Sequence, residues 1–231
     1  MNFVINYTNW QALEGLELTR IIVFAVLAYL VGSIPTAVIV SKGFFGMDIR
    51  EHGSGNAGAT NTFRVLGRNY GIIVMVIDVL KGFTAANFAF FIGNYFYGEE
   101  RFVNLQLLFG LLAVIGHVFP IYIGFKGGKG VATLFGMILS VNLPAAAICV
   151  VFFLIILLTT RFVSLSSMMA AVMLPVSILF IFHNHEKWLI VFGISIALMV
   201  ILTHRKNIKR LFGGNESKAN ILKKHRKENQ T

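Results

Sequence analysis

The sequence has few charged residues and a single cysteine. Of its 231 residues, 13% are charged and 56% are hydrophobic, whereas roughly a quarter are charged in an ordinary soluble domain. Cys149 lies in an apolar run, so the chain has no second thiol for an internal disulfide, and cysteine usage does not indicate a compartment. These shortages exclude an ordinary water-soluble globule and indicate a polytopic membrane protein.

Seven apolar runs predict the spanning helices. A spanning helix takes about 20 residues, so this chain length suffices for about seven spans with short connections. The run 131–141 is short for a crossing, and Pro144 predicts a break after it because proline disfavours helix at the preceding residue. We therefore expect an all-α, polytopic membrane protein of about seven transmembrane helices without a separate soluble domain. The seven runs cover residues 21–40, 72–92, 105–125, 131–141, 144–159, 162–182 and 188–202.

The basic residues mark one side of the membrane. The chain has 20 Lys and Arg against 10 Asp and Glu, a formal charge of +10. Sixteen of the twenty lie in the loops 42–70 and 125–130, at Arg161 and in the carboxyl-terminal tail. Because cytoplasmic loops carry the positive excess, we expect these segments at the cytoplasmic face and the amino terminus outside. This explanation of the charge leaves no need for a nucleic-acid partner.

The same topology predicts three parts of the chain. Residues 1–19 are expected to form an extracytoplasmic amino-terminal extension, residues 20–213 a seven-span membrane domain, and residues 214–231 a basic cytoplasmic tail. The first part lacks the basic start of a signal peptide. Insertion is therefore expected to begin with the first span.

The loop 53–64 combines glycines with small polar residues and Arg64. Its G-x-G-x-x-G pattern does not follow a strand, and Asp78, at the spacing of a ribose-binding acid, lies inside an apolar run, so a dinucleotide site is not predicted. Small residues at a helix start expose backbone N–H groups that bind anions. Arg64 adds a forked cation suited to phosphate. The alternative is a flexible connector, which would not need these polar side chains.

The loop 124–130 places Lys126 and Lys129 among four glycines before the next apolar run. It is not a Walker loop, because no Gly-Lys-Ser/Thr ends it. Exposed backbone beside two ammonium groups predicts a second anion site. The alternative is that the two lysines serve only as topological signals, which would not require bare backbone around them.

His204 and Asn207 follow the last apolar run at an i,i+3 spacing. On one continuous helix they would share a face, so we expect both to point to the same interfacial site. The alternative is a basic anchor for anionic lipid, which suits Lys206, Lys209 and Arg210 and does not explain the histidine and the asparagine.

An aspartate, a lysine and a histidine fall inside apolar runs. Asp78 and Lys81 are spaced i,i+3 and are expected to neutralise each other, either as a structural ion pair or as part of a site. His117 lies near the cytoplasmic end of its run, either as a helix contact or with a direct role. With one cysteine and two aspartates in the chain, no metal site is expected.

These motifs together resemble the acyl-phosphate-dependent glycerol-3-phosphate acyltransferases of bacterial membranes, the PlsY family. The resemblance covers residues 27–213. The matching segments are GSIPTA at Gly32, GSGNAGATNTFRVLG at Gly53, DVLKG at Asp78, GHVFPIYIGFKGGKG at Gly116 and HRKNIKRL at His204.

The resemblance implies both topology and activity. It implies seven spans in the bacterial inner or plasma membrane, an outside amino terminus and an active site facing the cytoplasm. It implies transfer of a fatty acyl group from acyl phosphate to the 1-hydroxyl of glycerol 3-phosphate, giving lysophosphatidic acid and inorganic phosphate, without a cofactor. Membrane lipid and an enzyme that produces acyl phosphate are the implied partners.

The resemblance also assigns residues to the site. Arg64, Lys129, His204 and Asn207 match positions of catalytic importance. Substrate binding is expected of a larger set of small, polar and basic residues. These are Ser54, Gly55, Asn56, Gly58, Thr60, Asn61, Lys126, Gly127, Gly128, Gly130, Asp78, Lys81 and His117.

Two rival functions are open on the residues alone. A phosphate-ester transporter also needs anion sites between helices, but transporters usually show related halves, and the sequence has no such repeat. A membrane scaffold that binds lipid through its basic tail would depend on residues 218–231 and not on Arg64.

Overall fold

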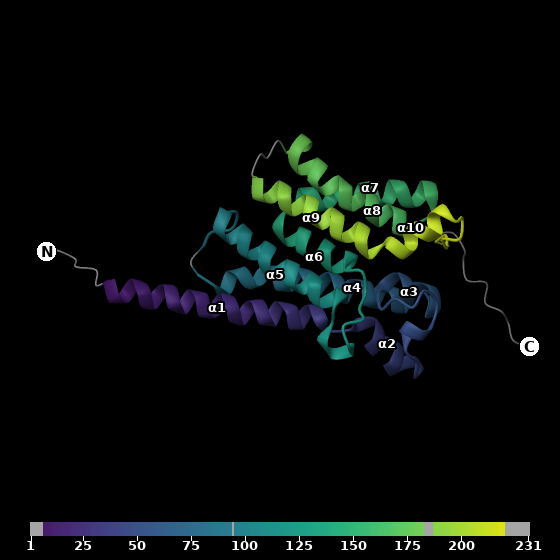
Figure 1. Cartoon of the computed structure of the whole chain (residues 1–231), viewed down its shortest axis with the longest axis horizontal. Helices are drawn as coiled ribbons and strands as arrows, with labels where there is room; N and C mark the ends of the chain where they lie inside the picture. The colour runs from purple at the N-terminus through teal and green to yellow at the C-terminus, as the bar shows by residue number, and fades with distance from the viewer. Residues whose placement is uncertain (1–6, 94, 183–186, 220–231) are drawn as a thin grey trace, which may run out of the picture. The chain divides into compact units, whose positions relative to one another are not determined.

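The computed structural model describes residues 7–93, 95–182 and 187–219 (Figure 1). The chain divides into two compact units, Met1–Leu143 and Pro144–Thr231. Within the described residues every regular element is helical and no strand occurs. The predicted all-α class is therefore confirmed.

The first unit contains six α-helices and three short 3₁₀ turns within its described residues. The α-helices are α1 (Tyr7–Ser33), α2 (Thr36–Phe45), α3 (Ala59–Val65), α4 (Arg68–Ala86), α5 (Glu100–Val118) and α6 (Val131–Val141). The 3₁₀ turns are η1 (Ile49–Glu51), η2 (Asn87–Phe91) and η3 (Ile121–Ile123).

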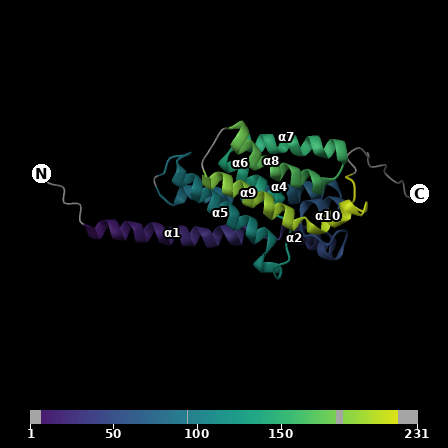
Figure 2. The ribbon, with the colours of Figure 1, turned by 45° about the horizontal axis from the view of Figure 1, so that its top comes forward.

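The second unit is built from four α-helices and a π turn in the part that the structure describes. They are α7 (Leu143–Thr160), α8 (Val163–Val176), η4 (Ser177–Ile181, the π turn), α9 (Lys187–Thr203) and α10 (Arg205–Phe212). α8 packs along α9, as Figures 1 and 2 both show. Pro175 near the end of α8 removes a helical hydrogen bond and precedes the π turn.

All seven predicted runs fall on helices, with one span broken where a continuous helix was expected. Five segments of the described chain are long and apolar enough to cross a membrane, and the bent pair α9–α10 would make a sixth. α6 is shorter, as its run predicted, and ends directly before α7. The five segments are 15–33, 68–91, 100–123, 143–160 and 163–181.

The run 21–40 was expected to form one span, and this is wrong. α1 ends at Ser33 and α2 begins at Thr36, with Pro35 between them. Proline disfavours helix at Ile34, and the Ile34 carbonyl accepts a hydrogen bond from Lys81 Nζ at 2.7 Å instead of a helical one. The chain therefore turns here, next to the loops that carry the anion motifs.

Glycines let the first unit's helices approach closely. A Cβ on Gly82 of α4 would collide with the carbonyl oxygen of Thr133 in α6, and a Cβ on Gly136 of α6 would collide with that of Val79 in α4. Small residues at such crossings allow backbones to pack without a large side chain between them. The α4–α6 pair therefore forms a fixed support for the loops at its end.

Candidate functional site

The first glycine loop, residues 53–58, is held from inside by Asn61. Its Nδ2 donates to the carbonyls of Ile49 at 3.1 Å and His52 at 2.9 Å. Its Oδ1 accepts from the Ser54 amide at 2.8 Å, and the residue is only 1% exposed. Asn61 was expected to offer a donor to substrate. Both of its amide hydrogens bind backbone carbonyls, so its side chain shapes the loop.

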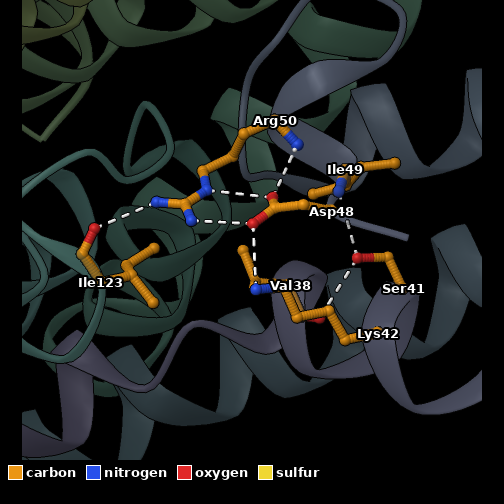
Figure 3. Close-up of polar contacts among 7 residues, drawn as sticks. All are labelled: Val38, Ser41, Lys42, Asp48, Ile49, Arg50 and Ile123. Atoms are coloured by element: carbon orange, nitrogen blue, oxygen red, sulfur yellow. Dashed lines mark hydrogen bonds and ion pairs between the residues drawn. The ribbon is translucent and has the colours of Figure 1, made fainter. Parts of the chain in front are cut away.

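Asp48 and Arg50 form an ion pair directly before this loop (Figure 3). Arg50 Nε and Nη2 donate to the two carboxylate oxygens of Asp48 at 3.0 and 2.8 Å. Lys42 Nζ lies 3.2 Å from Asp48 Oδ2. The Arg50 hydrogen bonds hold the pKa of Asp48 well below its usual range, with a further lowering by Lys42, although burial acts in the opposite direction. Asp48 is therefore a carboxylate at neutral pH.

The second glycine loop, residues 124–130, folds back along the end of α5. The Gly127 amide donates to the Val118 carbonyl at 3.2 Å, and the Gly128 amide donates to the His117 carbonyl at 3.1 Å. These bonds use carbonyls that a helix end leaves without partners. A Cβ on Gly128 would collide with Nε2 of the His117 ring. The loop can follow this path only because Gly127 and Gly128 have no side chains.

The two glycine loops meet. A Cβ on Gly58 would lie 4.0 Å from Cα of Gly128. A cavity of about 10 Å³ lies beside them, room for one water-sized sphere. The first unit thus brings together two motifs that are separated by about 70 residues in the chain. The cavity walls include Thr36, Ala57, His117, Gly127 and Gly128.

Asp78 and Lys81 form a buried ion pair on α4. Lys81 Nζ lies 2.8 Å from Asp78 Oδ1, and the Lys81 and Asp78 side chains are 5% and 2% exposed. Asp78 Oδ1 also accepts from Thr36 Oγ1 at 3.0 Å, and His117 Nδ1 lies 3.8 Å away. Because Lys81 also donates to the Ile34 carbonyl, the pair ties α4 to the break between α1 and α2. These contacts favour the structural ion pair of the two alternatives.

His204 lies at a 62° bend between α9 and α10 in the second unit. Its Nδ1 is 2.8 Å from the Val200 carbonyl oxygen. A carbonyl oxygen only accepts, so Nδ1 carries the hydrogen of this bond and Nε2 of a neutral ring keeps its lone pair. The helix stops at Thr203 and restarts at Arg205, so His204 stands at the bend and Asn207 lies in the first turn of α10. That both side chains point to the same site stays a prediction.

Glu216 connects the start of the tail to the second unit. It accepts hydrogen bonds from Asn207 Nδ2 at 2.6 Å, Ser164 Oγ at 2.7 Å and Arg210 Nε at 2.7 Å. Burial alone would raise the pKa of Glu216, but the hydrogen bonds from Arg210, Asn207 and Ser164 outweigh it and lower the pKa. Asn207, which is 6% exposed, is thereby fixed in orientation.

The other expected site residues differ in exposure. The part of the basic tail beyond residue 219 lies outside the described residues. The exposed residues are Ser54, Gly55, Thr60, Arg64 and Lys126. The half-buried ones are Asn56, Gly127 and Lys129, and the buried ones are Gly58, Gly128, Gly130, Asp78, Lys81 and His117.

Sequence reasoning assigned no role to Asp48, Arg50, Thr36 or Glu216. Asp48 is one of two aspartates in the chain and stands two residues before an arginine at the edge of the first glycine loop. Glu216 is an acid within a basic tail. Both signals are present in the sequence, but the distant contacts, from Arg50 to the Ile123 carbonyl and from Ser164 to Glu216, appear only in the structure.

Comparison with known proteins supports the family resemblance that the sequence motifs indicate. The family model described as "Glycerol-3-phosphate acyltransferase" matches residues 22–214. Glycerol-3-phosphate acyltransferase 2 of Bacillus cereus is 45% identical over 201 residues, covering 87% of this chain and 96% of the relative. Glycerol-3-phosphate acyltransferase of Macrococcus caseolyticus is 44% identical over 204 residues, covering 88% and 100%.

A solved structure shares the fold. The crystal structure of PlsY, an integral membrane glycerol 3-phosphate acyltransferase in its glycerol 3-phosphate form, matches with a TM-score of 0.76 and 35% identity, covering 86% of this chain and 95% of that one. Its lysophosphatidic acid form matches with a TM-score of 0.72 and 34% identity, covering 86% and 94%. These matches extend over most of the chain and agree with its apolar helices. The protein therefore belongs to the glycerol-3-phosphate acyltransferase family of multi-span integral membrane enzymes.

Proposed function

We propose that this enzyme transfers a fatty acyl group from acyl phosphate to the sn-1 hydroxyl of glycerol 3-phosphate, releasing lysophosphatidic acid and inorganic phosphate. The observation that carries the proposal is the meeting of the two glycine loops in the first unit. Bare backbone from two segments, beside Lys129, suits a phosphate group. An acyl donor that itself carries phosphate explains this better than a donor without one.

In this proposal the glycine loops and Lys129 hold the leaving phosphate. Arg64 holds the phosphate of the acceptor. It is exposed on α3, and no hydrogen bond or ion pair to another described residue engages its guanidinium. A guanidinium offers two parallel donors to a phosphate. Ser54, Thr60 and Asn56 supply neutral donors at the same loop.

The reaction is a substitution at the acyl carbon. The acceptor hydroxyl oxygen forms a bond to the carbonyl carbon, and the carbon–oxygen bond to phosphate then breaks, so phosphate leaves with the bonding electrons. An acyl phosphate is an activated mixed anhydride. The protein therefore mainly positions two anions and stabilises the oxyanion. No covalent acyl-enzyme is needed.

The hydroxyl proton goes either to His204 or to a phosphate oxygen of the substrate. The Nδ1 contact to the Val200 carbonyl sets the tautomer of a neutral His204 ring. Asn207 is the proposed orienting residue for the acceptor. Its amide is held by Glu216.

The proposed orientation in the membrane follows from the distribution of basic residues. We infer that the loops carrying Arg64 and Lys129 face the cytoplasm of a bacterial plasma membrane, because the basic residues gather there. The long acyl chain then stays in lipid while both phosphates are in water. The proposal requires a partner enzyme that produces acyl phosphate.

The test is a purified enzyme in detergent with acyl phosphate and glycerol 3-phosphate. Phosphate release and lysophosphatidic acid should appear in equal amounts, and acyl-CoA should not replace the donor. Lipid product from acyl-CoA alone would contradict the proposed donor. Uptake of labelled glycerol 3-phosphate into proteoliposomes without lipid product would instead support the transporter.

The first prediction concerns Arg64. Arg64→Ala should lower kcat/KM by at least about a hundredfold, or roughly 2.7 kcal/mol, because it removes the proposed phosphate clamp from an exposed position. Lys206→Ala is the control and should change kcat/KM little. Equal losses in both variants, each eluting as folded protein, would contradict the assignment.

A further inference from the structure

We propose that Arg50 is a positioning residue for this reaction, and that it fastens the two glycine loops to each other. This inference rests on the proposed function. Arg50 lies at the entrance of the first glycine loop, in η1, and reaches the carbonyl of Ile123 in η3, at the entrance of the second glycine loop. It is held for this task by Asp48 (Figure 3).

Asp48 fixes the guanidinium from two sides. Its carboxylate accepts from Arg50 Nε and Nη2, and also from the Arg50 backbone amide at 3.0 Å. The Asp48 side chain is only 10% exposed, so water competes weakly for these bonds. A bidentate arginine–carboxylate pair sets orientation as well as charge. The remaining nitrogen, Nη1, therefore has a defined direction.

Nη1 donates to the Ile123 carbonyl at 3.0 Å, across 73 positions of the chain. Ile123 immediately precedes Gly124, where φ is +70°, and both Ile123 and the loop glycines 127 and 128 line the small cavity. Because glycine backbone can adopt many conformations, this part of the chain needs a contact from another segment to fix its conformation. Arg50 supplies one.

The main chain of the same residue lies next to the first glycine loop. A Cβ on Gly55 would lie 3.2 Å from the Arg50 carbonyl oxygen, and φ of Gly55 is +71°. The loop thus passes directly over Arg50. One residue touches both loops, with its main chain on one side and its side chain on the other.

Arg50 differs from Arg64 in what its donors do. Each of its three nitrogens already bonds to a protein atom, whereas Arg64 is exposed. In this inference Arg50 acts on substrate through the loops, because three of its five N–H donors already hold protein atoms and fix the guanidinium in place. It is a positioning residue and not a catalytic one.

The sharpest variant is Arg50→Lys. An ammonium keeps the charge but cannot reproduce the forked contact with Asp48 and reach Ile123 at the same time. We expect KM for glycerol 3-phosphate and for acyl phosphate to rise at least about tenfold. The melting temperature and the folded yield should stay near those of the wild type, because a lysine still neutralises Asp48.

A matched control is Arg101→Lys. Arg101 also pairs with a carboxylate, Nη2 to Glu17 Oε1 at 2.7 Å, but it lies at the start of α5, whereas the second glycine loop follows the end of α5. It is not part of the proposed site. Both KM values should stay unchanged in this variant.

The experiment measures kcat, both KM values and melting temperature for the wild type, Arg50→Lys, Asp48→Asn, the double variant and Arg101→Lys. The double variant should have KM values no higher than those of Arg50→Lys, because both changes break the same series of contacts, from Asp48 through Arg50 to Ile123. Asp48→Asn keeps Arg50 but weakens its ion pair. This variant therefore tests the inference if Arg50→Lys does not fold.

The outcomes separate the two proposals. Wild-type KM values in folded Arg50→Lys and Asp48→Asn would overturn the inference while acyl transfer stands. Variants that lose folded protein but keep wild-type KM in the surviving fraction would also overturn it, since Arg50 would then be structural only. A wild type that transfers no acyl group from acyl phosphate would overturn the proposed function itself.

Discussion

At the scale of single residues, polar side chains near the glycine loops mostly bind backbone. Arg50 and Lys81 donate to the carbonyls of Ile123 and Ile34, which accept no helical hydrogen bond. Asn61 donates to the carbonyls of Ile49 and His52. A buried carbonyl without a partner costs free energy comparable to a lost hydrogen bond. Irregular loops next to a membrane domain therefore need such side chains, which leaves the exposed Arg64 and Ser54 for ligands.

The second prediction concerns Asn61. Asn61→Ala removes three hydrogen bonds from a buried position and should lower the free energy of unfolding by about 1–3 kcal/mol. The melting temperature in detergent measures it. Asn69→Ala, at an exposed position of α4, is the control and should change little. Equal melting temperatures for both variants would mean that Asn61 does not hold the loop.

The third prediction concerns the pH dependence of Asp48. Its pKa is below the usual value in the folded protein, so its ion pair stabilises the fold above about pH 4, the ordinary carboxyl value. This contribution is lost as the pH falls toward the folded-state pKa. The stability difference between wild type and Asp48→Asn, on the order of 1 kcal/mol, should be constant from pH 8 to 5 and shrink below pH 4.

Denaturation of the two proteins in detergent across this range measures that difference. The same comparison for Glu17→Gln serves as a control for general acid effects. A difference that already fades between pH 7 and 5 would contradict a lowered pKa of Asp48.

At the scale of elements, helix crossings and helix breaks determine where the loops lie. α4 and α6 approach through Gly82 and Gly136. The break after Ser33 falls inside the run 21–40, which reads as one apolar stretch. Hydropathy along the sequence does not reveal this break, because hydropathy measures transfer to lipid and not which carbonyls find a hydrogen-bond partner.

The fourth prediction compares two glycines. Gly82→Ala should destabilise the protein by several kcal/mol or prevent folding, because its Cβ would collide with a rigid backbone oxygen in α6. Gly43→Ala, at an exposed position of α2 with nothing within 4 Å, should be neutral or stabilise by about 0.5–1 kcal/mol. Folded yield and melting temperature in detergent report both effects. A Gly82→Ala protein as stable as Gly43→Ala would refute the close packing.

At the scale of the whole molecule, the long helices expose large apolar side chains. Ile22 and Val26 of α1 are 56% and 54% exposed, and Leu158 of α7 is 65% exposed. Large apolar side chains outside the core of a water-soluble protein would aggregate. In a multi-span membrane protein they face lipid, where helix packing relies on small residues instead.

The fifth prediction concerns topology. In a Cys149→Ala background, Glu99→Cys should react with a membrane-impermeant thiol reagent in intact cells. Glu51→Cys and Ser217→Cys should react only after the membrane is opened, because the basic segments around them are expected in the cytoplasm. The mass shift of the purified protein measures labelling. Labelling of Glu51→Cys in intact cells would contradict the proposed orientation.

Much of the candidate site could be named from sequence. Ser54, Arg64 and Lys129 stand in glycine-bearing motifs whose local chemistry indicates phosphate. Asp78 and Lys81 were recognised as a pair, which the structure confirms at 2.8 Å. Arg50 could not be singled out, because its meaning depends on a carbonyl 73 positions away.

The sequence by itself determined the all-helical membrane class, the positions of the apolar runs and the two glycine-bearing loops. These depend on composition and on local backbone exposure, which are properties of short segments. Only the tertiary structure decided where the runs break, that the two glycine loops meet, and which polar side chains support the loops. Those outcomes depend on which distant carbonyls and carboxylates come within hydrogen-bond distance, and packing sets that distance.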